Sequence, residues 1–107
     1  MNDTQGRVAI VTGASAGIGR ASALAFAKRG AHVVVADVDD ERGQSVAEEA
    51  AAIGPESMFV RTDVTNPDDV GALVHGCVAR FGRLDYALNN AGIQLPSAYI
   101  ADGTVDD

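Results

Sequence analysis

The sequence predicts an α/β fold in which parallel strands alternate with helices. Short apolar runs begin near Arg7, His32, Ser57 and Leu84, at intervals of 25, 25 and 27 residues by subtraction. Each run is continuous and rich in branched residues, as expected for parallel strands buried on both faces. The segments between them carry helix start and stop signals. This alternation predicts a parallel sheet with helices on both faces.

The first two helices are marked mainly by their ends. The first is expected over residues 18–29, with basic residues in its last turn and Gly30 immediately after it. The second is expected to begin among the acidic residues 39–41, because negative charges stabilise a helix N-terminus. The Gly-Pro pair at residues 54–55 ends it.

The third helix has the clearest boundaries. Asn66 is the expected N-cap, Pro67 occupies the first helical position, and two aspartates fill the first turn. Gly82 marks the C-terminal end. Its apolar stripe, at helical spacing, consists of Val70, Leu73, Val74, Cys77, Val78 and Phe81.

Right-handed crossovers between these strands predict the order 3-2-1-4, the first part of a Rossmann-like, doubly wound parallel sheet. Six strands at ~25 residues per unit need ~150 residues. The chain of 107 residues supplies four strands and three helices. We therefore expect residues 1–107 to be one partial domain that continues past Asp107. Its fourth strand would be an exposed apolar edge, so the isolated chain is expected to be marginally stable or to associate.

Composition excludes several classes of function. The 15 acidic and 8 basic residues give a net charge of −7, which disfavours binding to nucleic acid or to an anionic membrane. No apolar run approaches the ~20 residues of a membrane span, and the polar start is unlike a secretory signal. The single cysteine, Cys77, cannot form an internal disulfide, which indicates a cytoplasmic protein. The two histidines and the one cysteine, His32, His75 and Cys77, do not make a predicted metal site.

A glycine-rich loop, residues 12–19, joins the first strand to the first helix. It reads Thr-Gly-Ala-Ser-Ala-Gly-Ile-Gly, with glycines at Gly13, Gly17 and Gly19. Residues without a Cβ permit unusual backbone angles and close approach, so a pyrophosphate could meet the free N–H groups of the helix. The loop is not a P-loop, because Arg20 follows Gly19 where a lysine would stand. A glycine-rich turn without any ligand remains an alternative.

Asp37 ends the second strand, 18 residues beyond Gly19 by subtraction. An acidic residue about 20 residues past such a loop accepts hydrogen bonds from the adenosine ribose hydroxyls. The same carboxylate would repel a 2′-phosphate of charge close to −2, at ~1–4 kcal/mol per unit charge for a separation of ~4 Å. The cofactor expected is therefore NAD rather than NADP, although Arg20 and Arg42 keep the preference from being absolute. The alternative is an aspartate that only begins the next turn.

Three motifs together resemble the classical short-chain dehydrogenase/reductase family. They are the loop with its G-x-x-x-G-x-G spacing, the Asp-Val pair at residues 63–64, and Asn-Asn-Ala-Gly at residues 89–92. They occur in order at the carboxyl ends of successive expected strands. The resemblance covers about residues 6–92, and residues 93–107 would begin a substrate-side segment that is cut short.

The resemblance implies which residues contact the cofactor. The glycines would shape the loop, Ser15 and Ile18 would meet the phosphate and nicotinamide side, and Asp37 would bind the ribose. Asp63 would accept from the adenine amino group. For Asn89 and Asn90, a plain polar turn after the strand remains the alternative. The full set is Gly13, Ser15, Gly17, Ile18, Gly19, Asp37, Asp63, Val64, Asn90, Ala91 and Gly92.

The resemblance also implies hydride transfer between NAD and a small-molecule alcohol or ketone, in a full-length enzyme that is a homo-oligomer. The family's catalytic Ser and Tyr-x-x-x-Lys are not matched, because Tyr86 and Tyr99 are followed four residues on by Asn90 and Gly103. The only lysine is Lys28. The chain alone is therefore predicted to contain no catalytic residue and to be inactive. Two alternatives remain: a non-catalytic NAD-binding module, and one half of a split enzyme.

Overall fold

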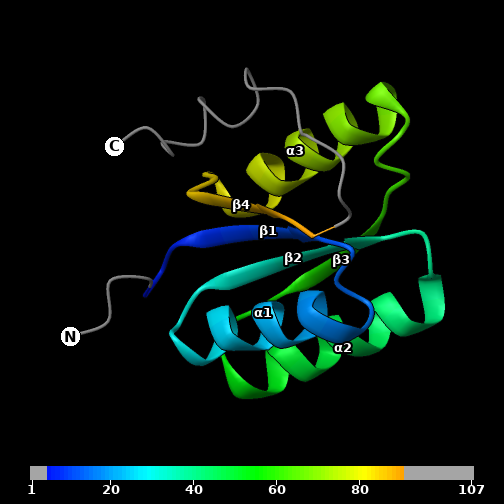
Figure 1. Ribbon diagram of the computed structural model, residues 1–107. Helices are drawn as coiled ribbons and strands as arrows, with labels where there is room; N and C mark the ends of the chain where they lie inside the picture. The colour runs from blue at the N-terminus through cyan, green and yellow to red at the C-terminus, as the bar shows by residue number, and fades with distance from the viewer. Residues whose placement is uncertain (1–4, 91–107) are drawn as a thin grey trace.

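The computed structural model describes residues 5–90 and shows four parallel strands alternating with three helices (Figure 1). The sheet order is β3-β2-β1-β4. The predicted α/β fold with a doubly wound sheet of order 3-2-1-4 is therefore confirmed. The elements are β1 (Val8–Thr12), α1 (Gly17–Lys28), β2 (His32–Asp37), α2 (Asp40–Ile53), β3 (Met58–Arg61), α3 (Pro67–Phe81) and β4 (Tyr86–Asn89).

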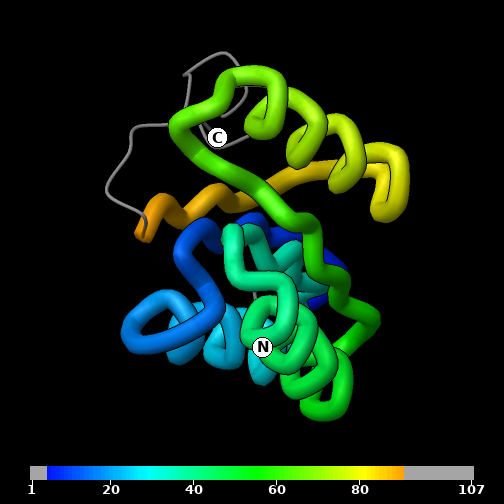
Figure 2. The backbone as a smooth tube through the Cα atoms, turned by 90° about the vertical axis from the view of Figure 1, so that its right-hand side faces the viewer, coloured from blue at the N-terminus to red at the C-terminus, as the bar shows by residue number. Residues whose placement is uncertain are grey.

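The helices cover the two faces of the sheet unequally. Helices α1 and α2 pack side by side on one face, and α3 covers the other (Figures 1 and 2). The two central strands are buried on both faces, as their continuous apolar runs predict. Under α1 and α2 the core includes Val11, Ala23, Ala27, Val33, Val35 and Ala47. Under α3 it includes Val8, Ile10, Val34, Leu73 and Cys77.

The helix ends match the capping residues of the sequence. Helix α1 begins at Gly17, one residue earlier than expected, and Gly30 beyond its end has a φ of 90°. The side chain of Asp39 accepts the Arg42 N–H at 3.0 Å and so caps α2. Asn66 caps α3, and Gly82 ends that helix in the left-handed region.

The stripe predicted for α3 is correct except at one edge. Val70, Leu73 and Cys77 are buried, and Val74 and Phe81 are partly buried. Val78 is 44% exposed. Eight residues at about 100° each leave Val78 roughly 80° around the helix from Val70, beyond the face that meets the sheet.

Strand β4 lies at the edge of the sheet in the part of the chain that the structure describes. Phe26 of α1 packs against Tyr86 of β4, with ring centroids 5.5 Å apart. Beside this pair, an open groove is lined by Ser22, Ala25, Phe26, Arg29 and Leu88. Leu88 is 37% exposed, so the predicted apolar edge is present. That the isolated chain is marginally stable or associates stays a prediction.

A buried carboxylate joins β4 to β1 at the side of the sheet where the strands begin, its amino edge. Asp85 is 3% exposed, and its Oδ2 accepts the Val8 N–H at 2.9 Å. Arg83 donates to both carboxylate oxygens, at 2.8 and 2.6 Å, and Arg7 lies 3.4 Å from Oδ1. Burial raises the pKa of Asp85, but the hydrogen bonds from Arg83 and Val8 outweigh it and hold the pKa below its usual value.

Replacing Asp85 with alanine should lower the free energy of unfolding by about 2–3 kcal/mol at pH 7, because it strands the Val8 N–H and removes charge-assisted bonds. The folded-state pKa is depressed, so this stabilisation is present above about pH 4 and is lost as pH falls through the folded-state pKa. Urea denaturation of the wild type and Asp85→Ala at pH 7 and pH 3 measures it. A difference that is equally large at pH 3 would contradict this account.

Candidate functional site

The segments that follow the four strands meet at the side of the sheet where the strands end, called here its carboxyl edge. Because all strands are parallel, their carboxyl ends share this edge, which is where ligands of open α/β sheets bind. The glycine-rich loop follows β1, Asp37 ends β2, the Asp-Val pair comes shortly after β3, and Asn90 follows β4. The edge lies on the right in Figure 1.

A pocket of about 140 Å³ opens at this edge. The structure brings together four residues singled out in the sequence, from three separate segments. The lining consists of Gly13, Ala36, Asp37, Val38, Thr62, Asp63 and Val64. Sequence reasoning missed Ala36, Val38 and Thr62. Val38 offered a signal, since it is a large apolar residue directly after a strand-ending aspartate, and it is 54% exposed.

The glycine-rich loop needs its glycines for two different reasons. Gly13 and Gly17 have φ values of 62° and 60°, which side chains rarely adopt. A Cβ on Gly19 would lie 2.0 Å from the carbonyl oxygen of Gly13. Helix α1 can therefore begin directly against the end of β1 only because Gly19 has no side chain.

The N-terminus of α1 differs from those of the other two helices in the described chain. Its N-cap, Ala16, makes no side-chain hydrogen bond, and no acidic residue occupies the first turn. Helices α2 and α3 have side-chain caps and two acids each in their first turns. The free N–H groups and positive dipole of α1 thus suit an anion. Ile18 beside them is 77% exposed.

The carboxylate of Asp37 is held by two backbone groups. Its Oδ1 accepts the Asp39 N–H at 3.1 Å, and its Oδ2 accepts the Ser15 N–H at 3.2 Å. Burial raises the pKa of Asp37, but the hydrogen bonds from Asp39 and Ser15 outweigh it and lower the pKa overall. Asp37 is therefore negatively charged at neutral pH, with its charge on the pocket wall.

Asp63 follows β3 and lines the same pocket, and β3 lies across β2 from β1. One of its oxygens, Oδ1, accepts from the N–H and the hydroxyl of Thr65, at 2.9 and 2.6 Å. These two hydrogen bonds lower the pKa of Asp63. Its own N–H donates to Asp69 at 3.0 Å, which fixes the turn into α3. Val64 beside it is half-buried.

The asparagine that ends β4 and the one that follows it differ in their hydrogen bonds. The Thr12 hydroxyl donates to Oδ1 of Asn89 at 3.0 Å and so ties β1 to β4. The Nδ2 of Asn90 is buried without an acceptor among residues 5–90. Such a donor costs free energy unless something outside those residues accepts from it. Ala91 and Gly92, also expected at the site, lie outside the described residues.

Residues 5–90 show no arrangement of side chains suited to metal binding or thiol chemistry. No group of three or more His, Cys, Asp or Glu side chains there could hold a metal ion. Burial, with a smaller effect of the Asp85 charge, raises the pKa of Cys77 to about 12, so its thiol is unreactive at neutral pH. Over the same residues, no helix combines the length and apolarity needed to cross a membrane.

Comparison with known proteins identifies the family. The family model described as short chain dehydrogenase matches residues 7–107. The chain belongs to the short-chain dehydrogenase/reductase family. Members of this family are oxidoreductases that use NAD or NADP and act on small molecules. The predicted resemblance is thereby confirmed.

Individual relatives agree with this assignment. Momilactone A synthase of Oryza sativa subsp. japonica is 50% identical over 95 residues, which cover 88% of this chain and 34% of the relative. Cis-4-hydroxycyclohexanecarboxylate dehydrogenase of Sinomonas cyclohexanicum is 49% identical over 92 residues, covering 86% and 36%. The chain thus spans about a third of the length of these short-chain dehydrogenase/reductase relatives.

Solved structures of the family superpose on the chain. The crystal structure of hydroxysteroid dehydrogenase from Escherichia coli has a TM-score of 0.79 at 35% identity, over 89% of this chain and 43% of that one. A short-chain type dehydrogenase/reductase from Mycobacterium marinum has a TM-score of 0.75 at 41% identity, over 79% and 34%. At these identities the likeness extends beyond the general fold.

Replacing Gly19 with alanine should destabilise the protein by about 1–3 kcal/mol, because the new methyl group meets the backbone of Gly13 and cannot be relieved by a side-chain rotation. Gly76→Ala is the matched control. A Cβ there has no atom within 4 Å, and alanine in a helix should stabilise by about 0.5–1 kcal/mol. Urea denaturation gives both values. Equal stability of the two variants would refute the close-contact argument.

Proposed function

We propose that this chain binds NAD(H) as the nucleotide-binding part of an NAD-dependent short-chain dehydrogenase/reductase. The observation that carries the proposal is the single pocket that joins the glycine-rich loop, Asp37 and the Asp63-Val64 pair. A dinucleotide needs an anion site, a hydroxyl acceptor and a surface for adenine, and these three segments offer one each. When bound, NAD would accept or supply the hydride exchanged with an alcohol or ketone.

Each residue at the edge has a proposed role toward the cofactor. The N–H groups at the start of α1 would hold the pyrophosphate, with Ser15 and Ile18 on the phosphate and nicotinamide side. Asp37 would accept from the ribose hydroxyls, and Asp63, with Val64 beside it, from the adenine amino group. Asn90 has a buried donor that suits a partner at the ribose side. Gly13, Gly17 and Gly19 would shape the loop, and Ala91 and Gly92 would complete the wall.

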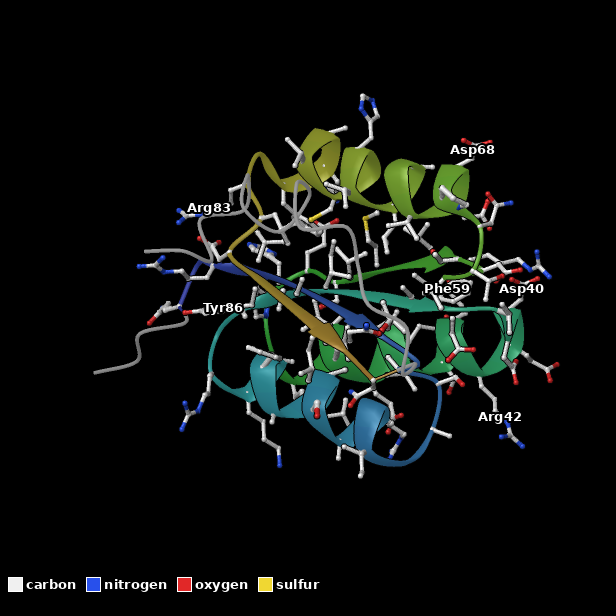
Figure 3. All side chains as sticks on the ribbon, turned by 45° about the horizontal axis from the view of Figure 1, so that its top comes forward. Asp40, Arg42, Phe59, Asp68, Arg83 and Tyr86 are labelled. Atoms are coloured by element: carbon white, nitrogen blue, oxygen red, sulfur yellow. The ribbon has the colours of Figure 1, made fainter. Side chains whose placement is uncertain are left out.

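The preference for NAD over NADP follows from charge. Asp37 is ionised at the pocket wall and would repel a 2′-phosphate. Arginines near Asp37 in the sequence or in the sheet are already engaged. Arg20 donates to Glu49 at 3.0 Å, and Arg42 lies 3.7 Å from Asp39. Arg61, opposite Asp37 in the register of β2 and β3, lies 3.4 Å from Asp40. A 2′-phosphate would therefore have to replace an acidic partner before one of these arginines could balance its charge. Arg42 points away from the sheet in Figure 3.

The remaining parts of the proposal concern the whole enzyme. The family's Tyr-x-x-x-Lys is not matched in this sequence, whose only lysine is Lys28, so the chain by itself would bind cofactor without turnover. The substrate would be a small alcohol or ketone. We place the protein in the cytoplasm, in keeping with its single, buried Cys77, and expect the full-length enzyme to be a homo-oligomer.

Isothermal titration with NAD and NADP tests the proposal. NAD should bind more tightly than NADP, by about fivefold to several-hundredfold for each unit of charge on the 2′-phosphate, from ~1–4 kcal/mol of repulsion per unit charge. Asp37→Ser should weaken NAD binding and narrow the gap between the two cofactors. Asp68→Asn, which removes one charge from the first turn of α3 at a residue that does not line the pocket, should leave the difference between the two affinities unchanged. Equal affinities in the wild type would rule out the proposed role of Asp37.

A further inference from the structure

The Asp37 side chain connects two turns that are distant in sequence. One oxygen accepts the N–H of Asp39, which is the N-cap of α2. The other accepts the N–H of Ser15, 22 residues upstream in the middle of the glycine-rich loop. A single carboxylate therefore joins the entry into α1 to the entry into α2. Neither contact involves a ligand.

We infer that Asp37 is a positioning residue for the glycine-rich loop, in addition to its proposed role as the ribose acceptor. The inference rests on the proposed function only for its effect on binding. The contact with Ser15 holds the loop in shape whether or not a cofactor is bound. A loop held in advance has less conformational freedom to lose on binding.

The loop has a physical need for such a tie. Gly13 and Gly17 both have positive φ values, and glycine loses more backbone freedom on ordering than any other residue. Ala14 is buried in the core, but residues 16–18 are exposed, so packing does little to fix this part of the loop. The N–H of Gly13 bonds to the Ala36 carbonyl at 2.9 Å, and the Asp37 carboxylate supplies the next tie. A hydrogen bond to a charged acceptor is roughly twice as strong as a neutral one.

The carboxylate has capacity for both tasks at once. Two carboxylate oxygens offer about four acceptor positions. The N–H groups of Ser15 and Asp39 donate to it, and the Ser15 hydroxyl and the Val38 N–H also contribute hydrogen bonds. Of these donors the Ser15 hydroxyl can rotate away, so a ribose hydroxyl can take its place while the Ser15 N–H still holds the loop.

The two possible roles of Asp37 predict opposite results for a ligand without ribose. If Asp37 only accepts from ribose, neutralising it removes a negative charge from the site and should improve the binding of a bare anion. If Asp37 also positions the loop, the N–H groups that face the anion become disordered and binding should weaken. Inorganic pyrophosphate, which has no hydroxyl groups of a sugar, separates these cases.

Asp37→Asn is the appropriate variant. An asparagine has nearly the shape of aspartate but one acceptor oxygen and one donor NH₂ group. Whichever way the amide is turned, the N–H of Ser15 or that of Asp39 must face a donor. Asp68→Asn is the matched control, because it removes the same charge from the first turn of α3 (Figure 3).

The first experiment is hydrogen exchange, followed by mass spectrometry, on the full-length protein that carries this chain, without cofactor. Amides of residues 13–19 should exchange about tenfold faster in Asp37→Asn than in the wild type, given the strength of a charged hydrogen bond. They should be unchanged in Asp68→Asn. Equal exchange of the loop in Asp37→Asn and the wild type would overturn the inference.

The second experiment is titration of the same proteins with inorganic pyrophosphate. Asp37→Asn should bind pyrophosphate several-fold more weakly than the wild type, although it carries one negative charge fewer. Equal or tighter binding by Asp37→Asn would overturn the inference. A wild type with a protected loop that fails to bind NAD would contradict the proposed function alone, whereas a wild type that binds NAD with an unprotected Ser15 amide would contradict the positioning role alone.

Discussion

The contact between Gly19 and the carbonyl of Gly13 is the constraint on which the site depends. A Cβ on Gly19 would come within 2.0 Å of that oxygen, so α1 can start directly against the end of β1 only with glycine there. This placement brings the uncapped N-terminus of α1 to the edge where β2 and β3 also end. The N-terminus of α1, Asp37 and the Asp63-Val64 pair are neighbours because the first turn is that tight.

Much of the fold could be predicted from the sequence because its determinants are local. Asn66, Pro67 and Gly82 mark α3 through contacts within one turn, and the buried strands show as continuous apolar runs. The handedness of the crossovers then favours the sheet order that the structure shows, among the few orders that a doubly wound sheet allows. Val78 was the exception, because helical spacing gives the direction of an apolar stripe but not the width of the surface that covers it.

The contacts that the sequence did not reveal are long-range and polar. Asp85 reads as one acid in an acidic chain, yet it is buried by a contact with Val8, 77 residues away. The bond from Ser15 to Asp37 depends on the twist that brings two turns together, and no local pattern encodes it. Thr62 lines the pocket only because β3 ends beside β2. The candidate site was thus predictable as a set of segments, whereas its internal hydrogen bonds were not.

Two aspartates at opposite sides of the sheet, Asp85 and Asp37, show how the same type of side chain can have different tasks. At the amino edge, the oxygens of Asp85 meet Arg83, the Val8 N–H and Arg7, and the side chain is almost fully covered. The negative charge of Asp85 is therefore used in contacts within the fold. At the carboxyl edge, Asp37 accepts from backbone N–H groups but is only half-buried and lines an open pocket. Whether a carboxylate can bind a ligand thus depends on how far the fold has already covered it and used its hydrogen-bonding positions.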